Sequence, residues 1–305
     1  MYDAVIEEES KTIPANHDNK INYAVDNSME ADVLKYIATN KPSLKILTPC
    51  FGGICHIGYV QSLMMTVKLF DSINFPLEIM FCKNDSLVSR ARNNLVALAM
   101  SDPDTTHIMF IDNDITWLPV DILKLVIVDK PLVGGVYPIK NYLWDNLRKD
   151  PANENNTNVI EGWITSKNNS NLDFITDNKL IQAKMLKYNV NYLNNVLSVS
   201  GNLAEVKHIA TGFMMIQRNV IEKMFNAFPK TKYTDDVGFL TGTQHDFAYA
   251  LFDCGVEDGH YLSEDWLFCH RWSKMDGKIY IHVTIDLVHT GVEDYSGSYM
   301  ASVFT

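Results

Sequence analysis

His107-Ile108-Met109-Phe110-Ile111-Asp112-Asn113-Asp114 is the stretch that decides the fold of this 305-residue chain. Its apolar part is short and nearly unbroken, which is typical of a strand buried on both faces of a sheet. Asp112 and Asp114 follow directly, at the carboxyl end of that strand, where ligands bind in open α/β sheets. Two carboxylates one residue apart can converge on one Mg²⁺ or Mn²⁺, which leaves positions free for substrate phosphates. The alternative is a polar turn in which Asp114 caps the next element.

Strand-like and helix-like segments alternate on both sides of this stretch. Strands are expected at residues 45–48, 77–82, 107–111 and 132–136, and helices at residues 59–70, 87–100 and 117–128. Asp85 or Ser86 is a candidate cap for the second of these helices. The alternation predicts an α/β fold with a mostly parallel central sheet flanked by helices.

The pattern changes after residue 138. Residues 139–205 are rich in Asn, and we expect an irregular insertion with a hairpin or two. The remaining elements are expected to be a strand at 206–217, a helix at 219–228, a helix at 263–275 capped by Ser263, and a strand pair at 278–288. The expected organisation is an N-terminal extension at 1–43 with a possible helix at 29–39, a single domain at 44–295 and a C-terminal tail at 296–305.

Composition limits the classes of partner. Hydrophobic residues make up 47% of the chain, which is enough for one large domain or two closely joined ones. A net charge of -11 argues against a general nucleic-acid partner, but a phosphorylated small substrate needs only a local basic pocket. No window approaches the roughly 20 apolar residues that span a bilayer, and the acidic residues 1–10 do not resemble a signal peptide. The five cysteines lack C-x-x-C spacing, so we expect reduced thiols and a cytoplasmic protein.

Further polar motifs could join the acidic pair in one site. Arg90 and Arg92 place two guanidiniums at the start of a helix, where they could bind a diphosphate or could pair with an acidic surface. Thr211 and Gly212 form a turn before an apolar strand. These residue types suit a phosphate-binding site, although each motif alone has a plain structural explanation.

The last motifs offer a base and a nitrogen ligand. Glu264 and Asp265 stand at an expected helix start, where the helix dipole favours acids, and either could also remove a proton from a substrate hydroxyl. His289 ends the last strand, with Gly291 permitting a tight turn, and could bind a metal through a ring nitrogen.

Taken in order, these segments resemble the GT-A-fold, nucleotide-sugar-dependent glycosyltransferases of microbes and their viruses, which carry a D-x-D motif. The resemblance spans about residues 44–292, and its segments are Ser-Arg-Ala-Arg-Asn, Phe-Ile-Asp-Asn-Asp, Val-Gly-Gly-Val-Tyr-Pro-Ile-Lys, Thr-Gly-Phe-Met-Met-Ile-Gln-Arg, Leu-Ser-Glu-Asp-Trp-Leu-Phe-Cys and His-Thr-Gly. It implies a Rossmann-like GT-A sheet with a nucleotide-binding half at 44–138 and an acceptor-binding, catalytic half at 206–295. Residues 1–43 and 139–205 carry no part of it.

The resemblance also implies the ligands and the residues that would bind them. The donor would be a UDP- or GDP-sugar, and the acceptor a hydroxyl of a glycan or glycoprotein. A Mn²⁺ or Mg²⁺ ion would be held by Asp112, Asp114 and His289, with Asp114 as the direct ligand. The donor would also meet Thr48, Pro49, Cys50, Arg90, Asp112 and Asn113. Asn113 departs from the small or acidic residue usual at the middle of the motif, which leaves the ribose contact open.

The mechanism implied is inverting, with Asp265 or Glu264 as the base, although retention stays possible. The compartment would be the cytoplasm, or the host cytoplasm for a viral protein, and the oligomeric state stays open. One alternative is a metal-dependent nucleotidyltransferase, which would usually carry a basic, Gly-rich loop after the first strand, whereas residues 49–53 contain no Lys or Arg. The other alternative is a non-catalytic module that binds a nucleotide sugar.

Overall fold

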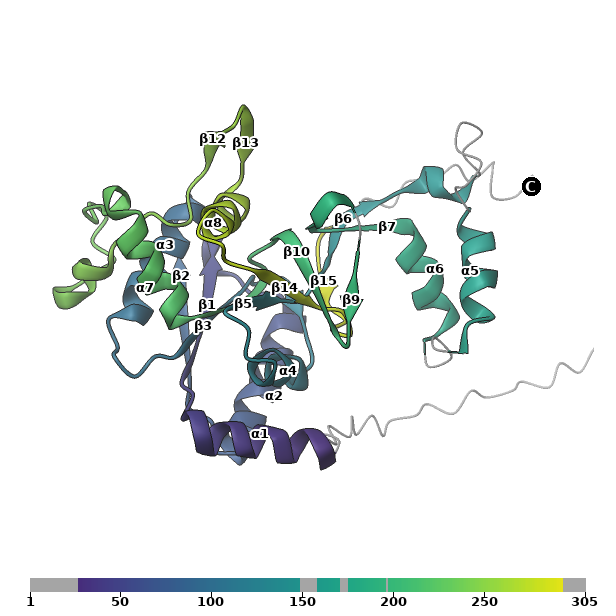
Figure 1. The fold of residues 1–305 in the computed structure, drawn as a ribbon, viewed down its shortest axis with the longest axis horizontal. Helices are drawn as coiled ribbons and strands as arrows, with labels where there is room; N and C mark the ends of the chain where they lie inside the picture. Colours follow the sequence, from purple (N-terminus) through teal and green to yellow (C-terminus); the bar gives the residue numbers. More distant parts are fainter. Residues whose placement is uncertain (1–26, 149–157, 171–174, 196, 293–305) are drawn as a thin grey trace, which may run out of the picture.

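The computed structural model describes residues 27–148, 158–170, 175–195 and 197–292 (Figure 1). Its centre is a nine-stranded sheet in the order β2-β1-β3-β11-β5-β14-β10-β8, with β9 paired to β10. The strands are β1 Leu44–Cys50, β2 Leu77–Lys83, β3 His107–Ile111, β5 Leu132–Gly134, β8 Val190–Tyr192, β9 Val199–Ser200, β10 Leu203–Ile209, β11 Phe213–Gln217 and β14 Ile279–His282.

Most of these strands run in one direction. β1 is parallel to both β2 and β3, and β5 is parallel to β14. β11 lies between β3 and β5 and is antiparallel to both, so β3 and β5 point the same way. β10 also runs against its neighbours β14, β8 and β9. The predicted α/β class, with a mostly parallel sheet flanked by helices, is confirmed.

Each face of the sheet is covered by its own layer of helices (Figure 1). One layer contains α3 Val88–Met100, α7 Arg218–Ala227 and α8 Glu264–Ser273, and the other contains α1 Asn27–Asn40, α2 Ile57–Ser72 and α4 Pro119–Ile127. β3 supplies both cores, because its side chains alternate: Ile108 and Phe110 pack in the first, and Met109 and Ile111 in the second. An apolar run is therefore what a strand in this position requires.

The six helices of these two layers lie where the sequence predicted helices, but one expected cap is wrong. The residue that caps α3 is Leu87, whose N–H donates to the Asp85 carboxylate over 2.9 Å, so Asp85 supports the helix from outside it. Ser263 does occupy the cap position of α8, although its hydroxyl donates to the Asp265 carboxylate and makes no cap bond to the backbone. No helix among the described residues is long and apolar enough to cross a membrane.

The expected single strand at 206–217 is wrong, because it is two strands in different places. β10 ends at Ile209, residues 210–212 turn, and β11 enters the sheet between β3 and β5. Gly212 makes the turn possible, since a Cβ there would lie 2.5 Å from the Tyr137 hydroxyl oxygen. The pair expected at 278–288 also separates: β14 joins the main sheet, while β15 Val288–His289 pairs with β4 Ile115–Thr116.

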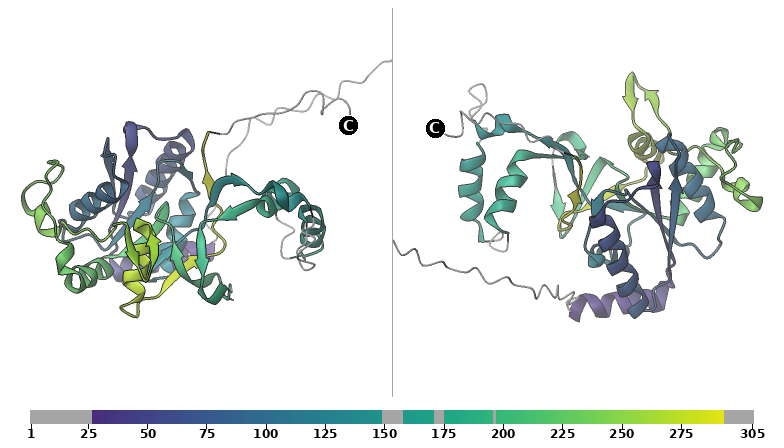
Figure 2. Two further views of the ribbon diagram at one scale, coloured as in Figure 1. Left: turned by 90° about the horizontal axis from the view of Figure 1, so that it is seen from above. Right: turned by 180° about the vertical axis from the view of Figure 1, so that it is seen from behind.

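The insertion at 139–205 is more regular than expected. β6 Pro138–Tyr142 and β7 Leu186–Tyr188 form a ribbon, which carries the helices α5 Val159–Lys167 and α6 Asp177–Met185 away from the sheet (Figures 1 and 2). A hairpin is present where β9 pairs with the start of β10, but the two helices were not predicted. One signal for them existed, because Asn158 and Glu161 form a capping box at the start of α5, with Asn158 Oδ1 accepting the Glu161 N–H over 2.8 Å.

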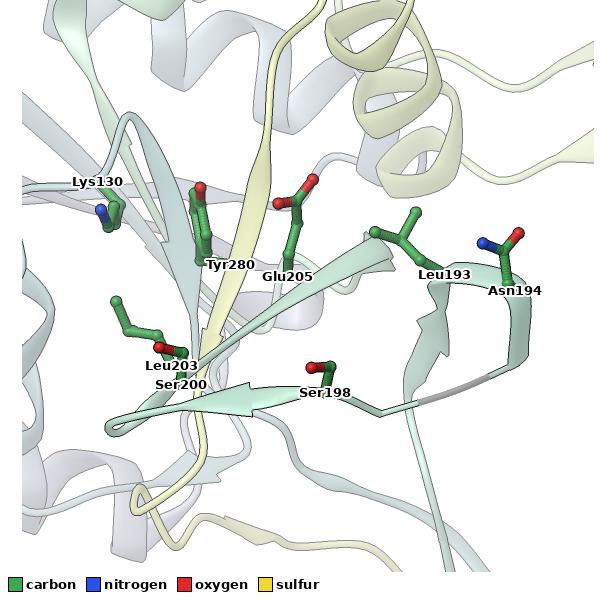
Figure 3. Close-up of a pocket in the computed structure, with 8 residues that line it drawn as sticks. All are labelled: Lys130, Leu193, Asn194, Ser198, Ser200, Leu203, Glu205 and Tyr280. Carbon is green, nitrogen blue, oxygen red and sulfur yellow. The ribbon is translucent and has the colours of Figure 1, made fainter.

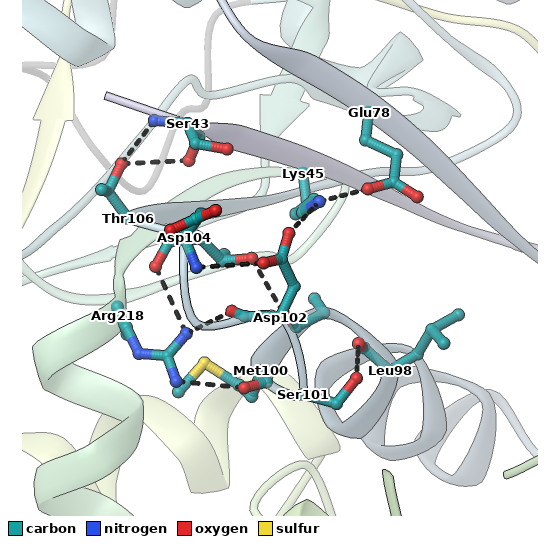
Figure 4. Close-up of polar contacts among 12 residues, drawn as sticks. Ser43, Lys45, Glu78, Leu98, Met100, Ser101, Asp102, Asp104, Thr106 and Arg218 are labelled. Atoms are coloured by element: carbon teal, nitrogen blue, oxygen red, sulfur yellow. Dashed lines mark hydrogen bonds and ion pairs between the residues drawn. The ribbon is translucent and has the colours of Figure 1, made fainter. Parts of the chain in front are cut away.

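Polar groups close the amino end of β1 (Figure 4). Lys45 is buried and forms ion pairs with Glu78 and, at 2.6 Å, with Asp102. Arg218, at the start of α7, donates to the carbonyls of Met100 and Asp102 over 3.0 and 2.8 Å. This network ties the end of α3, the amino end of β1 and the start of α7 together.

Candidate functional site

The predicted acidic residues meet at the carboxyl edge of the sheet. The Asp112 N–H donates to the Gly212 carbonyl over 3.1 Å, which joins the end of β3 to the turn before β11. The Asp114 carbonyl accepts the Thr290 N–H over 2.9 Å, and the β4–β15 pairing places His289 opposite Ile115. Residues 112–114, 212 and 289, which are far apart in sequence, therefore lie together.

Asp114 lies between two basic side chains. Its Oδ2 is 2.5 Å from Lys140 Nζ and 3.5 Å from His289 Nε2. Burial alone would raise the pKa of Asp114, but hydrogen bonds and charges from His289 and Lys140 outweigh it and lower that pKa to about 2. Lys140 was not predicted as a site residue. Gly291 makes room for it, since a Cβ there would lie 2.6 Å from Lys140 Cδ, so this glycine matters for space as well as for chain direction.

His289 and Asp114 are two residues that could hold a cation together. His289 Nδ1 lies 2.8 Å from the Pro138 carbonyl oxygen and must carry the hydrogen, because a carbonyl can only accept. Nε2 is then the ring nitrogen that faces the Asp114 carboxylate: in the protonated ring it donates to that carboxylate, and in the neutral ring it offers a lone pair, as in metal sites where a backbone carbonyl orients a ligating histidine. Two acceptors that face each other are stabilised by a positive ion between them. Among the described residues, no three acidic, histidine or cysteine side chains are grouped closely enough to form a complete metal site.

Asp112 is held by Arg92, which the sequence named beside Arg90 as a candidate but which was not among the residues expected to meet the donor. Arg92 is only 3% exposed, and its Nη2 lies 2.9 Å from Asp112 Oδ1 while its Nε lies 3.3 Å from Glu264 Oε1. Its guanidinium carbon is also 5.2 Å from the centre of the Phe110 ring. One buried cation thus connects the end of β3 with the start of α8. Its Nη1 is buried without a hydrogen-bond partner among the described residues.

Arg90 lies on another side of α3. Its guanidinium pairs with Asp85 through two contacts, Nε to Oδ2 at 2.8 Å and Nη2 to Oδ1 at 2.7 Å. This is the surface pairing that the sequence left open as the alternative to nucleotide binding. Helix geometry predicts that the two arginines differ, because residues i and i+2 are about 200° apart around the helix axis and therefore point to nearly opposite sides. Only one of Arg90 and Arg92 could face the sheet.

Glu264 and Asp265 have different surroundings although they are adjacent. Glu264 contacts Arg92, whereas Asp265 Oδ1 accepts from the Ser263 hydroxyl and, over 2.8 Å, from the Trp266 N–H. Burial, followed by the charge of Glu264, raises the pKa of Asp265. The Trp266 ring stacks on His208 with ring centres 5.2 Å apart, which fixes the first turn of α8.

The residues expected to line a nucleoside pocket lie at the end of β1, mostly beneath the surface. Thr48 is fully buried, and its hydroxyl lies 2.7 Å from the Tyr59 hydroxyl. Cys50 is buried and Pro49 is half-buried. The exposed groups here belong to the loop that follows, where the Phe51 side chain is 73% exposed. Asn113 reaches the same loop, because its Nδ2 donates to the Ile54 carbonyl over 2.6 Å.

Two cavities lie away from these residues. One of about 610 Å³ opens beside the starts of β5 and β14 and is lined by Lys130, Leu193, Asn194, Ser198, Ser200, Leu203, Glu205 and Tyr280 (Figure 3). A second, of about 400 Å³, shares Lys130 and Tyr280 with it. Neither contains a predicted site residue. The candidate site therefore rests on convergent polar side chains at the carboxyl edge of the sheet.

Comparison with known proteins assigns neither a family nor a function to this chain. No protein-family model matches the chain, and no curated protein sequence does. Among solved structures, the chain is similar to one titled "Crystal Structure of A197 from STIV", at 13% sequence identity over 82% of this chain and 86% of that chain. The TM-score is 0.44, so the function has to be argued from the residues of this chain.

Proposed function

We propose that this chain is a glycosyltransferase that moves a sugar from a nucleotide-sugar donor to a hydroxyl of a glycan or glycoprotein. The observation that carries the proposal is the convergence of Asp112, Asp114, His289, Glu264 and Asp265 at one edge of the sheet. They come from three segments of the chain, and Arg92, from a fourth, bridges Asp112 and Glu264. The resemblance of these same segments to GT-A-fold enzymes supports the same function.

Asp114 and His289 are the residues that would hold a Mn²⁺ or Mg²⁺ ion, with Asp112 beside them. Such an ion would act as a Lewis acid on the leaving nucleoside diphosphate. His289 suits this role because Pro138 orients its ring, and Asp114 suits it because its low pKa keeps the carboxylate ionised. Lys140 also contacts Asp114 and would have to move or share that carboxylate when a cation binds.

Asp265 is the better candidate for the base. Glu264 is engaged by Arg92, so its charge is already paired, whereas only a hydroxyl and a backbone N–H hold the carboxylate of Asp265. Burial raises the pKa of Asp265, which brings it closer to neutral pH, where a general base is most effective. In the proposed reaction, Asp265 removes the proton of the acceptor hydroxyl as that oxygen attacks the anomeric carbon, and the configuration is inverted.

A donor screen with matched variants tests the proposal. UDP- and GDP-sugars are added to the full chain with and without Mn²⁺, and both thermal stabilisation and donor hydrolysis are measured. We expect one nucleotide class to stabilise the chain only with Mn²⁺, and Asp114→Ala to lose that response. Asp145→Ala is the control, because Asp145 lies beyond β6 in the insertion and its side chain is almost fully exposed. A response of Asp114→Ala equal to that of the control would contradict the proposed metal-donor site.

A further inference from the structure

Two cysteines lie at the two ends of the loop that contacts Asn113. Cys50 is the last residue of β1, Cys55 precedes α2, and their Sγ atoms are 3.5 Å apart. Cys50 is buried and Cys55 is half-buried, so one thiol of the pair is open to a small reagent. Both are free thiols, as the sequence predicted. The Sγ atoms would have to approach by about 1.5 Å to reach the roughly 2.05 Å of a disulfide bond.

We propose that Cys50 and Cys55 form a reversible disulfide with a low-molecular-weight disulfide as the oxidant, and that this bond alters the donor site through Asn113. The role at the donor site rests on the proposed function, while the disulfide itself does not. The cysteines enclose residues 51–54, of which Gly52 and Gly53 have φ of 71° and 67°. Glycine adopts positive φ as readily as negative φ, so the backbone of this short loop can change conformation when the two cysteines approach each other.

The loop is fastened to the acidic motif by two hydrogen bonds. Asn113 Nδ2 donates to the Ile54 carbonyl over 2.6 Å, and the His56 N–H donates to the Asn113 carbonyl over 2.9 Å. These bonds flank Cys55 on both sides. A shift of Cys55 toward Cys50 is therefore passed to Asn113, which lies between Asp112 and Asp114.

The chemistry is thiol–disulfide exchange in two steps. Burial and the neighbouring Cys55 raise the pKa of the Cys50 thiol to about 12, so Cys55 is the thiol that reacts first. The Cys55 thiolate attacks one sulfur of the small disulfide and releases one thiol. Cys50 then loses its proton and attacks Cys55 Sγ, which expels the second thiol. Two protein thiols are oxidised, the small disulfide is reduced to two thiols, and the two protons end on those thiols.

The remaining cysteines differ in ways that provide controls. Cys254 is exposed and would form adducts of its own, so the experiment uses a Cys254→Ser background. Cys82 is buried close to Cys50, because its charge contributes to the raised pKa of the Cys50 thiol, and it is the alternative partner. Cys269 is fully buried against the Ile209 carbonyl and should not react.

The test incubates the full Cys254→Ser chain with oxidised glutathione and then maps its peptides after alkylation. We expect a Cys50–Cys55 disulfide, with the loss of two hydrogen atoms in mass and of two alkylation sites. Cys82→Ser should form it equally well, and Cys55→Ser should not form it. Hydrogen exchange should show slower exchange at residues 54–58 and a change at residues 113–116 in the oxidised chain.

A lasting glutathione adduct on Cys55, a Cys50–Cys82 bond, or unchanged exchange at residues 113–116 would overturn the inference. The affinity of the reduced and oxidised chains for UDP and GDP with Mn²⁺ is measured in parallel, and weaker binding is expected after oxidation. If neither nucleotide binds either form, the proposed function fails, while mass and exchange still decide the disulfide and its coupling to Asn113.

Discussion

Replacing Arg92 should reveal how strongly one buried guanidinium holds the candidate site together. Arg92→Met keeps most of the side-chain length and removes the charge, which leaves Asp112 and Glu264 without their cation. Two charge-assisted hydrogen bonds of about 1.5–3 kcal/mol each are lost. The side chain of Asp112 is 28% exposed and can be solvated by water. That of Glu264 is only 14% exposed, so most of the lost stability comes from leaving its carboxylate without a cation. The substitution also removes the buried Nη1, which has no hydrogen-bond partner among the described residues, and this offsets the loss of stability by about 1–3 kcal/mol.

The balance of these values is a loss of about 2–3 kcal/mol in the free energy of unfolding. Urea unfolding measures it, and Arg90→Met on the same helix is the control, with a smaller loss because its ion pair reaches solvent. Adding Glu264→Gln to Arg92→Met should recover part of the stability, because no buried carboxylate is then left unpaired. A loss below about 0.5 kcal/mol, or a double variant whose effects simply add, would refute the idea that Arg92 neutralises a buried acid.

Three further changes test other parts of the structure. Gly212→Ala should destabilise the chain in thermal unfolding, because the new Cβ would lie 2.5 Å from the Tyr137 hydroxyl oxygen, and an unchanged melting temperature would show that the turn has room. Burial lowers the pKa of His107 to about 4, so the unfolded chain binds its proton first and stability should fall as the pH drops from about 6.5 to 4, by up to about 1.4 kcal/mol per pH unit. His107→Gln should flatten that decline in urea titrations, and an identical slope would remove His107 as a contributor. Asp265→Asn should keep donor binding and lower transfer by roughly 10²–10⁴-fold in a turnover assay, more than Glu264→Gln does, and full activity would exclude Asp265 as the base.

The elements and the acidic motif could be predicted from the sequence because their causes are local. The apolar run at 107–111 predicts a buried strand whichever strands pair with it, since its side chains on both faces need cover. Acids directly after it must lie at its carboxyl end. The sequence placed Asp114 just after one strand and His289 at the end of another, and the pairing of β15 with β4 brings the two side chains together.

Tertiary packing decided the features that depend on distant partners. β11 enters between β3 and β5, and no local pattern says which gap in the sheet a strand will fill. The sequence indicates a turn at Thr211 and Gly212, but only the folded chain decides that the strands on its two sides lie in different parts of the sheet, with the Gly212 N–H donating to the hydroxyl of Tyr137, 75 residues away. The short helices α5 and α6 have weak apolar periodicity in their sequences, and packing against each other stabilises them.

Arg92 shows most clearly which features the sequence determined and which the tertiary structure decided. The sequence alone determined that two arginines stand at the start of a helix, and helix geometry makes them point apart. Only the folded chain decided that Arg92 turns inward, because Asp112 from β3 and Glu264 from α8 arrive there from distant parts of the sequence. A buried charge is tolerated only where opposite charges meet it, so its place cannot be read until those partners have been brought together in space.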